Sequence, residues 1–150
     1  MRAVVQRVLS ASVEVETVTI DEIGPGLLLF LGITHTDNEK DISWLAEKAV
    51  NLRIFADENG KMNYSLKDLS LSMLIVSQFT LYGDCRKGRR PGFSEAAPPA
   101  RAEVLYQNFI REVEALGISV ATGQFQAEMS VSLVNDGPIT LTLDTDFLKS

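Results

Sequence analysis

Two apolar segments constrain the fold of this chain more than any other feature. Residues 26–33 read GLLLFLGI, and residues 71–81 read LSMLIVSQFTL. Neither segment approaches the roughly 20 apolar residues that a membrane-spanning helix needs. Because short runs that are apolar on both faces are typical of buried strands, we interpret both segments as strands, with the first at the centre of a sheet.

An alternating pattern opens the chain. Within residues 2–20, Val13 and Val15 lie on one face of an extended segment, and Glu14 and Glu16 lie on the other. This period of two is the signature of a half-buried strand. The opening residues therefore predict an antiparallel pair of strands.

Two segments have the apolar spacing of amphipathic helices. The first, EKDISWLAEKAVNL at residues 39–52, follows Asp37 and Asn38, which are both candidate N-caps. The second begins at Pro98-Pro99 and ends at Gly117, in agreement with the preference of proline for helix starts and of glycine for helix ends.

Two further segments read as strands joined by turns. Residues 53–63, RIFADENGKMN, predict a strand and an Asn59-Gly60 turn, and residues 125–145 predict a hairpin closed by NDGP at 135–138. Proline adds nothing to such a turn, because it removes a backbone N–H where the returning strand begins. Another demand must fix this backbone, and Gly137–Pro138 is the strongest candidate for a cis peptide bond.

These elements predict the α+β class: a single domain over residues 1–150, with a mainly antiparallel, barrel-like sheet and two main helices. Strands predominate, and the sequence shows no parallel βαβ rhythm. A length of 150 residues fits one domain, and 45% hydrophobic with 23% charged residues is ordinary for a globular protein. The first ten residues lack the continuous apolar segment of a secretory signal, so we expect a cytoplasmic protein with no membrane partner.

The scarcity of histidine and cysteine argues against several common kinds of catalytic and metal site. His35, the single histidine, follows a buried strand, and we assign it no catalytic role. Cys85, the single cysteine, allows no intrachain disulfide and no multi-thiolate metal site. Motifs for metal, nucleotide and dinucleotide binding are absent, so no metal and no cofactor are predicted. We interpret the paired carboxylates at 112 and 114 and at 144 and 146 as solvated faces.

The polar end of the second buried segment, SQFTL at residues 77–81, is a candidate site. Ser77, Gln78 and Thr80 offer hydroxyl and amide groups, and backbone N–H groups around Phe79 become free once strand pairing stops. A structural role, in which the hydroxyls satisfy neighbouring carbonyls, explains the same pattern. Thr80 as a nucleophile would need a base, and the sequence shows none.

A basic loop follows at once. The stretch GDCRKGRRPGF, residues 83–93, places Arg86, Lys87, Arg89 and Arg90 within five positions of a chain whose net charge is −6. Arginine binds phosphate through two parallel hydrogen bonds, so a phosphate clamp is one interpretation and a solvated loop is the other. Because the loop directly follows SQFTL, we expect both at the same rim of the fold.

The motifs together resemble the bacterial D-aminoacyl-tRNA deacylases of the dimeric type. The resemblance runs from MRAVVQRV at the start through GLLLFLGI, RIFADENGKMN and VSQFTL to TGQFQAEMSVSLVNDGPIT at 122–140. Two departures are small: Ile139 stands where the family usually has valine, and Gly92 stands where serine is frequent. Neither residue belongs to the chemistry that the resemblance implies.

The resemblance implies a homodimer for translation quality control that hydrolyses the ester between a D-amino acid and the 3′-terminal adenosine of tRNA. In the family the Gly-Pro bond, here Gly137–Pro138, is cis, and its carbonyls enter the pocket of the partner subunit. There they act as a chirality filter, which accepts a D-aminoacyl group or glycine and collides with an L side chain.

Other residues take roles from the same resemblance. Ser77 and Gln78 would contact the terminal nucleotide, and Phe125 and Met129 would line the adenine pocket. The N–H groups around Phe79 and Thr80 would stabilise the oxyanion. Phenylalanine and methionine are also common core residues, so burial explains Phe125 and Met129 equally well.

The mechanism and the function both have alternatives. Either the 2′-hydroxyl of the terminal ribose helps to activate water, or Thr80 is the nucleophile; the absence of an activating residue favours the first. Two other functions fit parts of the sequence: an RNA-binding module without turnover, and an esterase for small esters. The missing His-activated serine and the cationic loop argue against the esterase.

Overall fold

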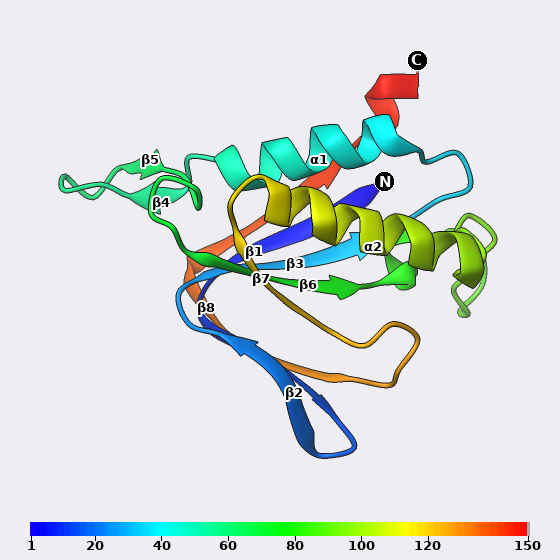
Figure 1. Ribbon diagram of the computed structural model, residues 1–150. Coiled ribbons are helices and arrows are strands. Elements are labelled where there is room, and N and C mark those ends of the chain that lie inside the picture. Colours follow the sequence, from blue (N-terminus) through cyan, green and yellow to red (C-terminus); the bar gives the residue numbers. More distant parts are fainter. Residues whose placement is uncertain (150) are drawn as a thin grey trace.

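The computed structural model describes residues 1–149, so the last residue of the predicted domain, 150, lies outside the description. A strongly curled sheet carries two helices on one face (Figure 1). In chain order the elements are β1 (Arg2–Val15), β2 (Val18–Ile23), β3 (Gly26–Gly32), α1 (Glu39–Asn51), β4 (Phe55–Ala56), β5 (Met62–Tyr64), β6 (Ser72–Ser77), the 3₁₀ helix η1 (Phe79–Tyr82), α2 (Pro99–Ala115), β7 (Ser119–Thr122), β8 (Ser130–Asp144) and the 3₁₀ helix η2 (Asp146–Lys149).

The main sheet has the order β2-β1-β3-β6-β7, and β8 pairs with β1. β1 is antiparallel to β2, β3 and β8. β3, β6 and β7 run parallel to one another. The two main helices and the prevalence of strands confirm the predicted α+β class.

The expectation that parallel βαβ units are absent is wrong. The chain crosses from β3 through α1 to β6, and from β6 through α2 to β7, and each return is parallel. The first crossover also contains the β4–β5 hairpin, and the second contains η1 and the basic loop. These insertions hide the short alternation of strand and helix by which such units are recognised in a sequence.

The hairpin predicted over residues 125–145 is also wrong. β8 is one strand that pairs with β1 from Asp144 opposite Arg2 to Ser130 opposite Glu14. The register slips opposite NDGPIT, so this motif is an irregularity within a strand rather than a turn between two strands. Asn135 closes it, because Ile139 N donates to Asn135 Oδ1 (2.7 Å) and Asn135 Nδ2 donates to Ile139 O (3.1 Å). The Gly137–Pro138 bond is cis.

The curled sheet forms a near-barrel with a core of its own. Asp21 Oδ2 in β2 accepts a hydrogen bond from Thr122 N in β7 (2.9 Å), which joins the two ends of the strand order. The barrel interior holds the buried side chains Val8, Ala11, Val13, Ile23, Leu28, Leu74, Val76 and Ala121. The helices cover a second cluster on the other face, which includes Leu27, Leu29, Leu31, Met73 and Ile75. β3 and β6 are therefore buried on both faces, as predicted.

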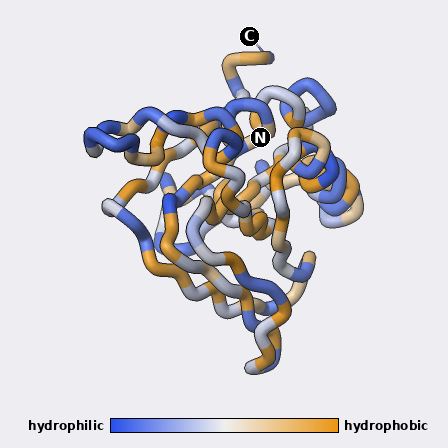
Figure 2. The backbone as a smooth tube through the Cα atoms, turned by 60° about the vertical axis from the view of Figure 1, so that its left-hand side comes forward, coloured by the Kyte–Doolittle hydropathy of each residue, from blue (hydrophilic) through white to orange (hydrophobic). Residues whose placement is uncertain are grey.

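Hydrophobic residues recur in short stretches along the backbone, in strands and helices alike (Figure 2). Among the helices of residues 1–149, none has the length and the hydropathy to cross a bilayer.

Both helices begin and end as the sequence predicts. Asn38 caps α1: its Oδ1 accepts a hydrogen bond from Lys40 N (2.9 Å), and its own N–H donates to Asp41 Oδ2 (2.9 Å). α2 has Pro99 in its first turn, and Gly117 follows its end with a φ of 93°. The Asn59-Gly60 turn is also present, between β4 and β5.

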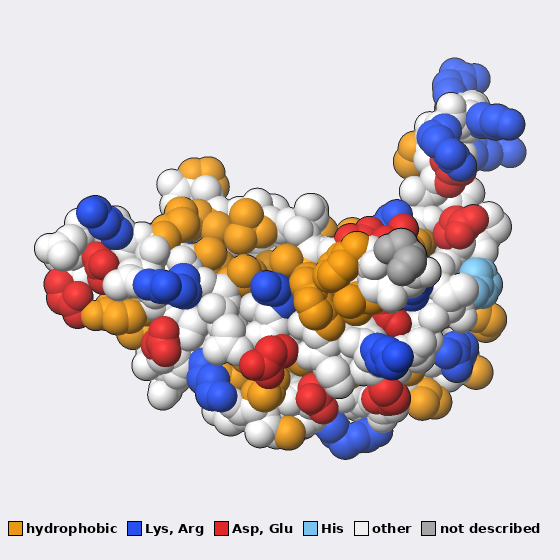
Figure 3. Space-filling view, turned by 90° about the horizontal axis from the view of Figure 1, so that it is seen from above, with side chains coloured by type: hydrophobic (Ala, Val, Ile, Leu, Met, Phe, Trp, Pro, Cys, Tyr) orange, Lys and Arg blue, Asp and Glu red, His pale blue; other side chains and the backbone are white. Residues whose placement is uncertain are grey.

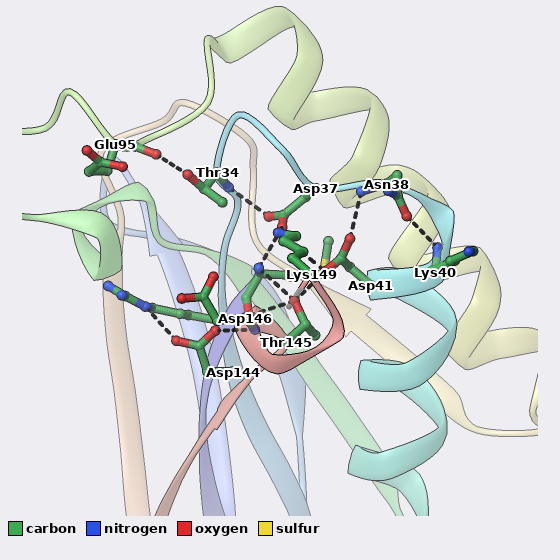
Figure 4. A network of polar contacts seen from close by, with 12 residues as sticks. Thr34, Asp37, Asn38, Lys40, Asp41, Glu95, Asp144, Thr145, Asp146 and Lys149 are labelled. Atoms are coloured by element: carbon green, nitrogen blue, oxygen red, sulfur yellow. Dashed lines mark hydrogen bonds and ion pairs between the residues drawn. The ribbon is translucent and has the colours of Figure 1, made fainter.

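A buried carboxylate fixes the loop between β3 and α1. Asp37 is fully buried, and its Oδ1 pairs with the α-ammonium group of Met1 (2.6 Å) and with Lys149 Nζ (2.5 Å). Its Oδ2 accepts a hydrogen bond from Thr34 N (2.7 Å). Figure 4 shows this network extending from Thr34 to Glu95, in the segment that precedes α2. The loop after β3 is thereby held to the ends of the chain and to the start of α2.

We expect Gly26→Ala to lower the free energy of unfolding by about 2 kcal/mol or more. A Cβ atom at Gly26 would lie 1.9 Å from the carbonyl oxygen of Ser72, so β3 and β6 would have to move apart. Urea denaturation measures the effect. Gly24→Ala is the matched control, since a Cβ there has no atom within 4 Å, and it should change the stability by less than about 0.5 kcal/mol. Equal losses in the two variants would contradict the close approach of the two strands.

Candidate functional site

A cleft of about 630 Å³ opens where three parallel strands end. Leu31 near the end of β3 lies opposite Ser77 at the end of β6, and the loop at 123–129 follows β7. Because the carboxyl ends of parallel strands meet at one edge of a sheet, the segments that follow them gather there. Five of the predicted site residues line this cleft: Ser77, Gln78, Phe79, Phe125 and Met129.

The SQFTL motif changes from strand to 3₁₀ helix inside the cleft. β6 ends at Ser77, not at Leu81 as predicted, and η1 begins at Phe79. Gln78 N donates to Leu31 O (2.8 Å), which is the last bond between the two strands. The N–H groups of Phe79 and Thr80 are the first of η1 and have no acceptor within it. The expectation that strand pairing stops within this motif is therefore right, although the boundary is not.

Thr80 lies at the rim, exposed and outside the cleft lining. Its hydroxyl accepts a hydrogen bond from Gln78 Nε2. An amide N–H is a donor and takes no proton, so this contact does not activate the hydroxyl as a nucleophile. Of the residues of 1–149 that line the cleft, none is Asp, Glu, His, Lys, Arg, Cys or Tyr. The described residues, 1–149, thus bring no general base into the cleft.

Two aromatic rings stand at the mouth of the cleft. Phe79 is 57% exposed and Phe93 is 38% exposed, and their ring centroids lie 5.1 Å apart at an interplanar angle of 70°. The sequence patterns did not point to Phe93 as a site residue. The feature that could have indicated it is its position just after a cluster of cations, because aromatic residues beside basic residues are typical of sites for single-stranded nucleic acid.

The floor of the cleft is fixed from below. Tyr106 of α2 is buried, its hydroxyl donates to Ile75 O (2.8 Å), and its ring lies 5.8 Å from that of Phe125. Burial raises the pKa of the Tyr106 hydroxyl, which keeps it neutral and donating. Met129 packs on Gly123, where a Cβ would lie 2.8 Å from its sulfur. Both predicted pocket residues, Phe125 and Met129, therefore line the cleft and also contact the core.

The basic loop projects from one end of the molecule and carries a cluster of Lys and Arg side chains (Figure 3). Backbone hydrogen bonds of 2.7 and 2.9 Å between Asp84 and Gly92 close the loop. All four predicted cations, Arg86, Lys87, Arg89 and Arg90, are exposed and lie outside the cleft lining. Arg86 also binds Asp84 through two hydrogen bonds of 2.9 and 2.8 Å, so its charge is partly compensated. These hydrogen bonds lower the pKa of Asp84 to about 2.

The NDGPIT motif lies outside the cleft of its own chain. Gly137 and Pro138 are exposed on the irregular part of β8 and do not line the cleft. Beside them, Arg7 Nε of β1 donates to Asp136 O (3.1 Å), and Arg7 Nη1 donates to Ile54 O (2.6 Å). The sequence patterns did not single out Arg7. A cation within the alternating apolar pattern of the first strand was the feature that could have indicated it. Within a single chain, the NDGPIT motif therefore does not reach the cleft that contains the SQFTL motif.

No three His, Cys, Asp or Glu side chains within residues 1–149 gather as a metal site requires.

Comparison with known proteins decides the family. The model of the family described as D-Tyr-tRNA(Tyr) deacylase matches residues 4–144. The chain belongs to this family. It is 60% identical over 145 residues to the D-aminoacyl-tRNA deacylase of Thermosipho africanus, with 97% of each chain covered. It is 57% identical over 145 residues to the enzyme of the same name from Clostridioides difficile, again with 97% of each covered. The family and the enzyme class expected from the sequence are both confirmed.

Two solved structures share the fold. The first, a c-Myc DNA unwinding element binding protein, superposes with a TM-score of 0.91 at 40% identity, over 97% of this chain and 99% of that one. The second, a probable eukaryotic D-amino acid tRNA deacylase, has a TM-score of 0.83 at 17% identity, over 95% and 97% of the two chains. At that identity the second similarity bears on the fold alone.

We expect a carboxyl-carbon NMR titration to give Asp84 a pKa of about 2, and Arg86→Gln to return it toward 3.8. Because the pKa of the folded state is depressed, the contribution of the pair is complete above about pH 3.8 and is lost as the pH falls toward 2. Arg89→Gln is the matched control and should leave the Asp84 titration unchanged. A similar rise in both variants would mean that the whole loop, and not Arg86, depresses the pKa.

Proposed function

We propose that the protein hydrolyses the ester bond between a D-amino acid and the 3′-terminal adenosine of tRNA, and releases the free amino acid and tRNA. Glycine on mischarged tRNA is a second substrate, and L-aminoacyl-tRNA is spared. The observation that carries the proposal is the family match over residues 4–144, together with a cleft lined by SQFTL residues. The reaction belongs to translation quality control in the cytoplasm, where aminoacyl-tRNA is used.

The cleft suits the terminal nucleoside in size and in chemistry. Its volume of about 630 Å³ lies within the range of roughly 300–1,000 Å³ that is usual for small-molecule sites. Phe125 and Met129 supply apolar walls for the adenine. Ser77 and Gln78 supply hydroxyl and amide groups for the ribose and the ester.

The reaction needs orientation and oxyanion stabilisation more than a protein base. Water bonds to the ester carbonyl carbon, the carbon–oxygen bond to the ribose breaks, and the proton from water passes to the departing ribose oxygen. The N–H groups of Phe79 and Thr80, which start η1, serve as donors to the oxyanion. Within residues 1–149 the cleft lining contributes no titratable side chain, which supports a role for the 2′-hydroxyl of the terminal ribose in activating water.

The chirality filter requires a second copy of the chain. Among the strands of residues 1–149, β8 pairs with β1 alone, so the other edge of this 15-residue strand is unpaired, and its Val134 and Leu141 side chains are exposed. Long exposed edge strands are avoided in soluble proteins unless something covers them. In the proposed homodimer, the carbonyls of Gly137 and Pro138 reach the cleft of the other protomer. There they leave room for a D side chain or for glycine and collide with an L side chain.

The basic loop is the proposed contact for tRNA phosphates. The chain has a net charge of −6, so most of its surface repels a polyanion. Arg86, Lys87, Arg89 and Arg90 provide a local positive surface in the loop that leads directly to Phe93, a residue of the cleft lining.

The test is the initial rate of tyrosine release from D-Tyr-tRNA and from L-Tyr-tRNA by the purified protein. We expect release from the D substrate to be about 100-fold faster or more, because steric exclusion acts on the L side chain alone. Equal rates of release from both substrates would refute the proposed chirality filter. Binding of both without release would indicate an RNA-binding module, and efficient hydrolysis of chromogenic esters would indicate an esterase.

We expect Thr80→Ala to retain single-turnover activity on D-Tyr-tRNA within about 10-fold of the unmodified protein, since its hydroxyl contacts Gln78 and meets no base. Covalent catalysis by Thr80 predicts a loss of several orders of magnitude, with partial recovery in Thr80→Ser. Circular dichroism of both variants controls for the integrity of the fold. A loss of several orders of magnitude in a well-folded Thr80→Ala protein, with partial recovery in Thr80→Ser, would contradict this expectation and revive covalent catalysis by Thr80.

A further inference from the structure

The exposed phenylalanine pair at the mouth of the cleft is not accounted for by the hydrolysis itself. We propose that Phe93 is a stacking surface for the base of the nucleotide immediately 5′ of the terminal adenosine. The site would thus read two nucleotides of a single-stranded 3′ end: the terminal one in the cleft and the preceding one on Phe93. This inference rests on the proposed function and adds a second nucleotide subsite to it.

The exposure of Phe93 is the first observation. Its ring is 38% exposed beside Phe79, which is 57% exposed, and both rings line the cleft. The two rings meet edge to face, and both remain partly exposed at the mouth of the cleft. Apolar surface exposed next to a cleft is typical of a ligand-binding surface.

The ring is also held in place before any ligand arrives. A Cβ at Gly83 would lie only 3.1 Å from Phe93 Cε1, so the absence of a side chain at Gly83 lets the ring lie against the backbone there. Ordering the ring in advance reduces the entropy that binding would otherwise cost.

The segment after Phe93 is anchored to the end of β3. His35 Nε2 donates to Ser94 O (2.7 Å), Thr34 Oγ1 donates to Glu95 O (2.5 Å), and Ala97 N donates to Ile33 O (2.9 Å). Thr34 is itself fixed by the buried Asp37 (Figure 4). His35, which the sequence left without a role, thus positions the residue next to Phe93.

Charge identifies the occupant as nucleic acid. The basic loop closes at the Asp84–Gly92 pair, and Phe93 is the next residue, so the ring lies between the cleft and the cations. Sites for single-stranded nucleic acid combine aromatic rings with nearby positive charge, because the bases stack on the rings while the phosphates pair with the cations. A chain of nucleotides that leaves the cleft toward Arg89 and Arg90 passes Phe93 first.

The experiment compares two substrates that differ only beyond the terminal nucleoside: D-Tyr-tRNA and 3′-O-D-tyrosyl-adenosine. We expect Phe93→Ala to raise KM for D-Tyr-tRNA about 10-fold with little change in kcat. For the adenosine ester, which has no second base, KM should stay within about twofold. Phe93→Leu should behave like Phe93→Ala, because it keeps an apolar side chain but loses the flat face, whereas Phe93→Trp should retain a low KM.

Phe147→Ala is the matched control, since it removes an exposed phenylalanine that packs edge to face on Trp44, away from the cleft. It should leave both KM values unchanged. Equal effects of Phe93→Ala on the two substrates, or a normal KM for tRNA in Phe93→Leu, would overturn the proposal.

A binding measurement separates this inference from the proposed hydrolysis. The dinucleotide CpA and adenosine are titrated against the unmodified protein and Phe93→Ala by calorimetry. We expect Phe93→Ala to weaken CpA binding about 10-fold and to leave adenosine binding unchanged. Failure of hydrolysis with this pattern intact would refute the enzyme and keep the subsite. If the protein hydrolyses the substrate but Phe93→Ala and the unmodified protein bind CpA equally well, the enzyme activity would stand and the subsite would be refuted.

Discussion

The parallel pairing of β3 with β6 is the constraint on which the cleft depends. Both strands are apolar on both faces, so they are stable only between the helices on one side and the barrel interior on the other. Their parallel register brings Leu31 opposite Ser77, and the bond from Gln78 N to Leu31 O ends the ladder. Where pairing ends, backbone N–H groups become available, so the same packing that buries the core also creates the polar turn of the cleft.

The pairing of β8 with β1 determines the position of the NDGPIT motif. Its first half pairs with β3, its second half pairs with β2, and β8 follows it along the other edge. The register slip opposite NDGPIT leaves Gly137 and Pro138 outside the regular ladder, and Arg7 ties the neighbouring carbonyl of Asp136 to β1. Proline is tolerated in a strand at such an irregularity, because no ladder hydrogen bond is required of it there.

The sequence predicted elements better than it predicted their connections. The two-faced strands, the Asn38 cap, the proline at the start of α2 and the Asn59-Gly60 turn depend on local chemistry, and the structure has all of them. The parallel crossovers and the unbroken β8 depend on pairing with distant strands, which outweighed the local turn signal of Asp-Gly. Phe93 was missed for a similar reason: its exposure and its place at the cleft mouth come from anchors at Thr34 and His35, far away in the sequence.

The part of the chain that the structure describes places no titratable side chain in the cleft lining, which favours a site that works by positioning the substrate. In the proposed reaction, which uses no protein base, the rate would depend on how well the ester, the water and the oxyanion donors are aligned, and alignment requires groups that do not move. Each part of the site is accordingly tied down before substrate binds: Gln78 to Thr80, Tyr106 to Ile75, Arg86 to Asp84 and His35 to Ser94. The proposed chirality filter of main-chain carbonyls would follow the same logic, because a collision discriminates only when the colliding group holds its place.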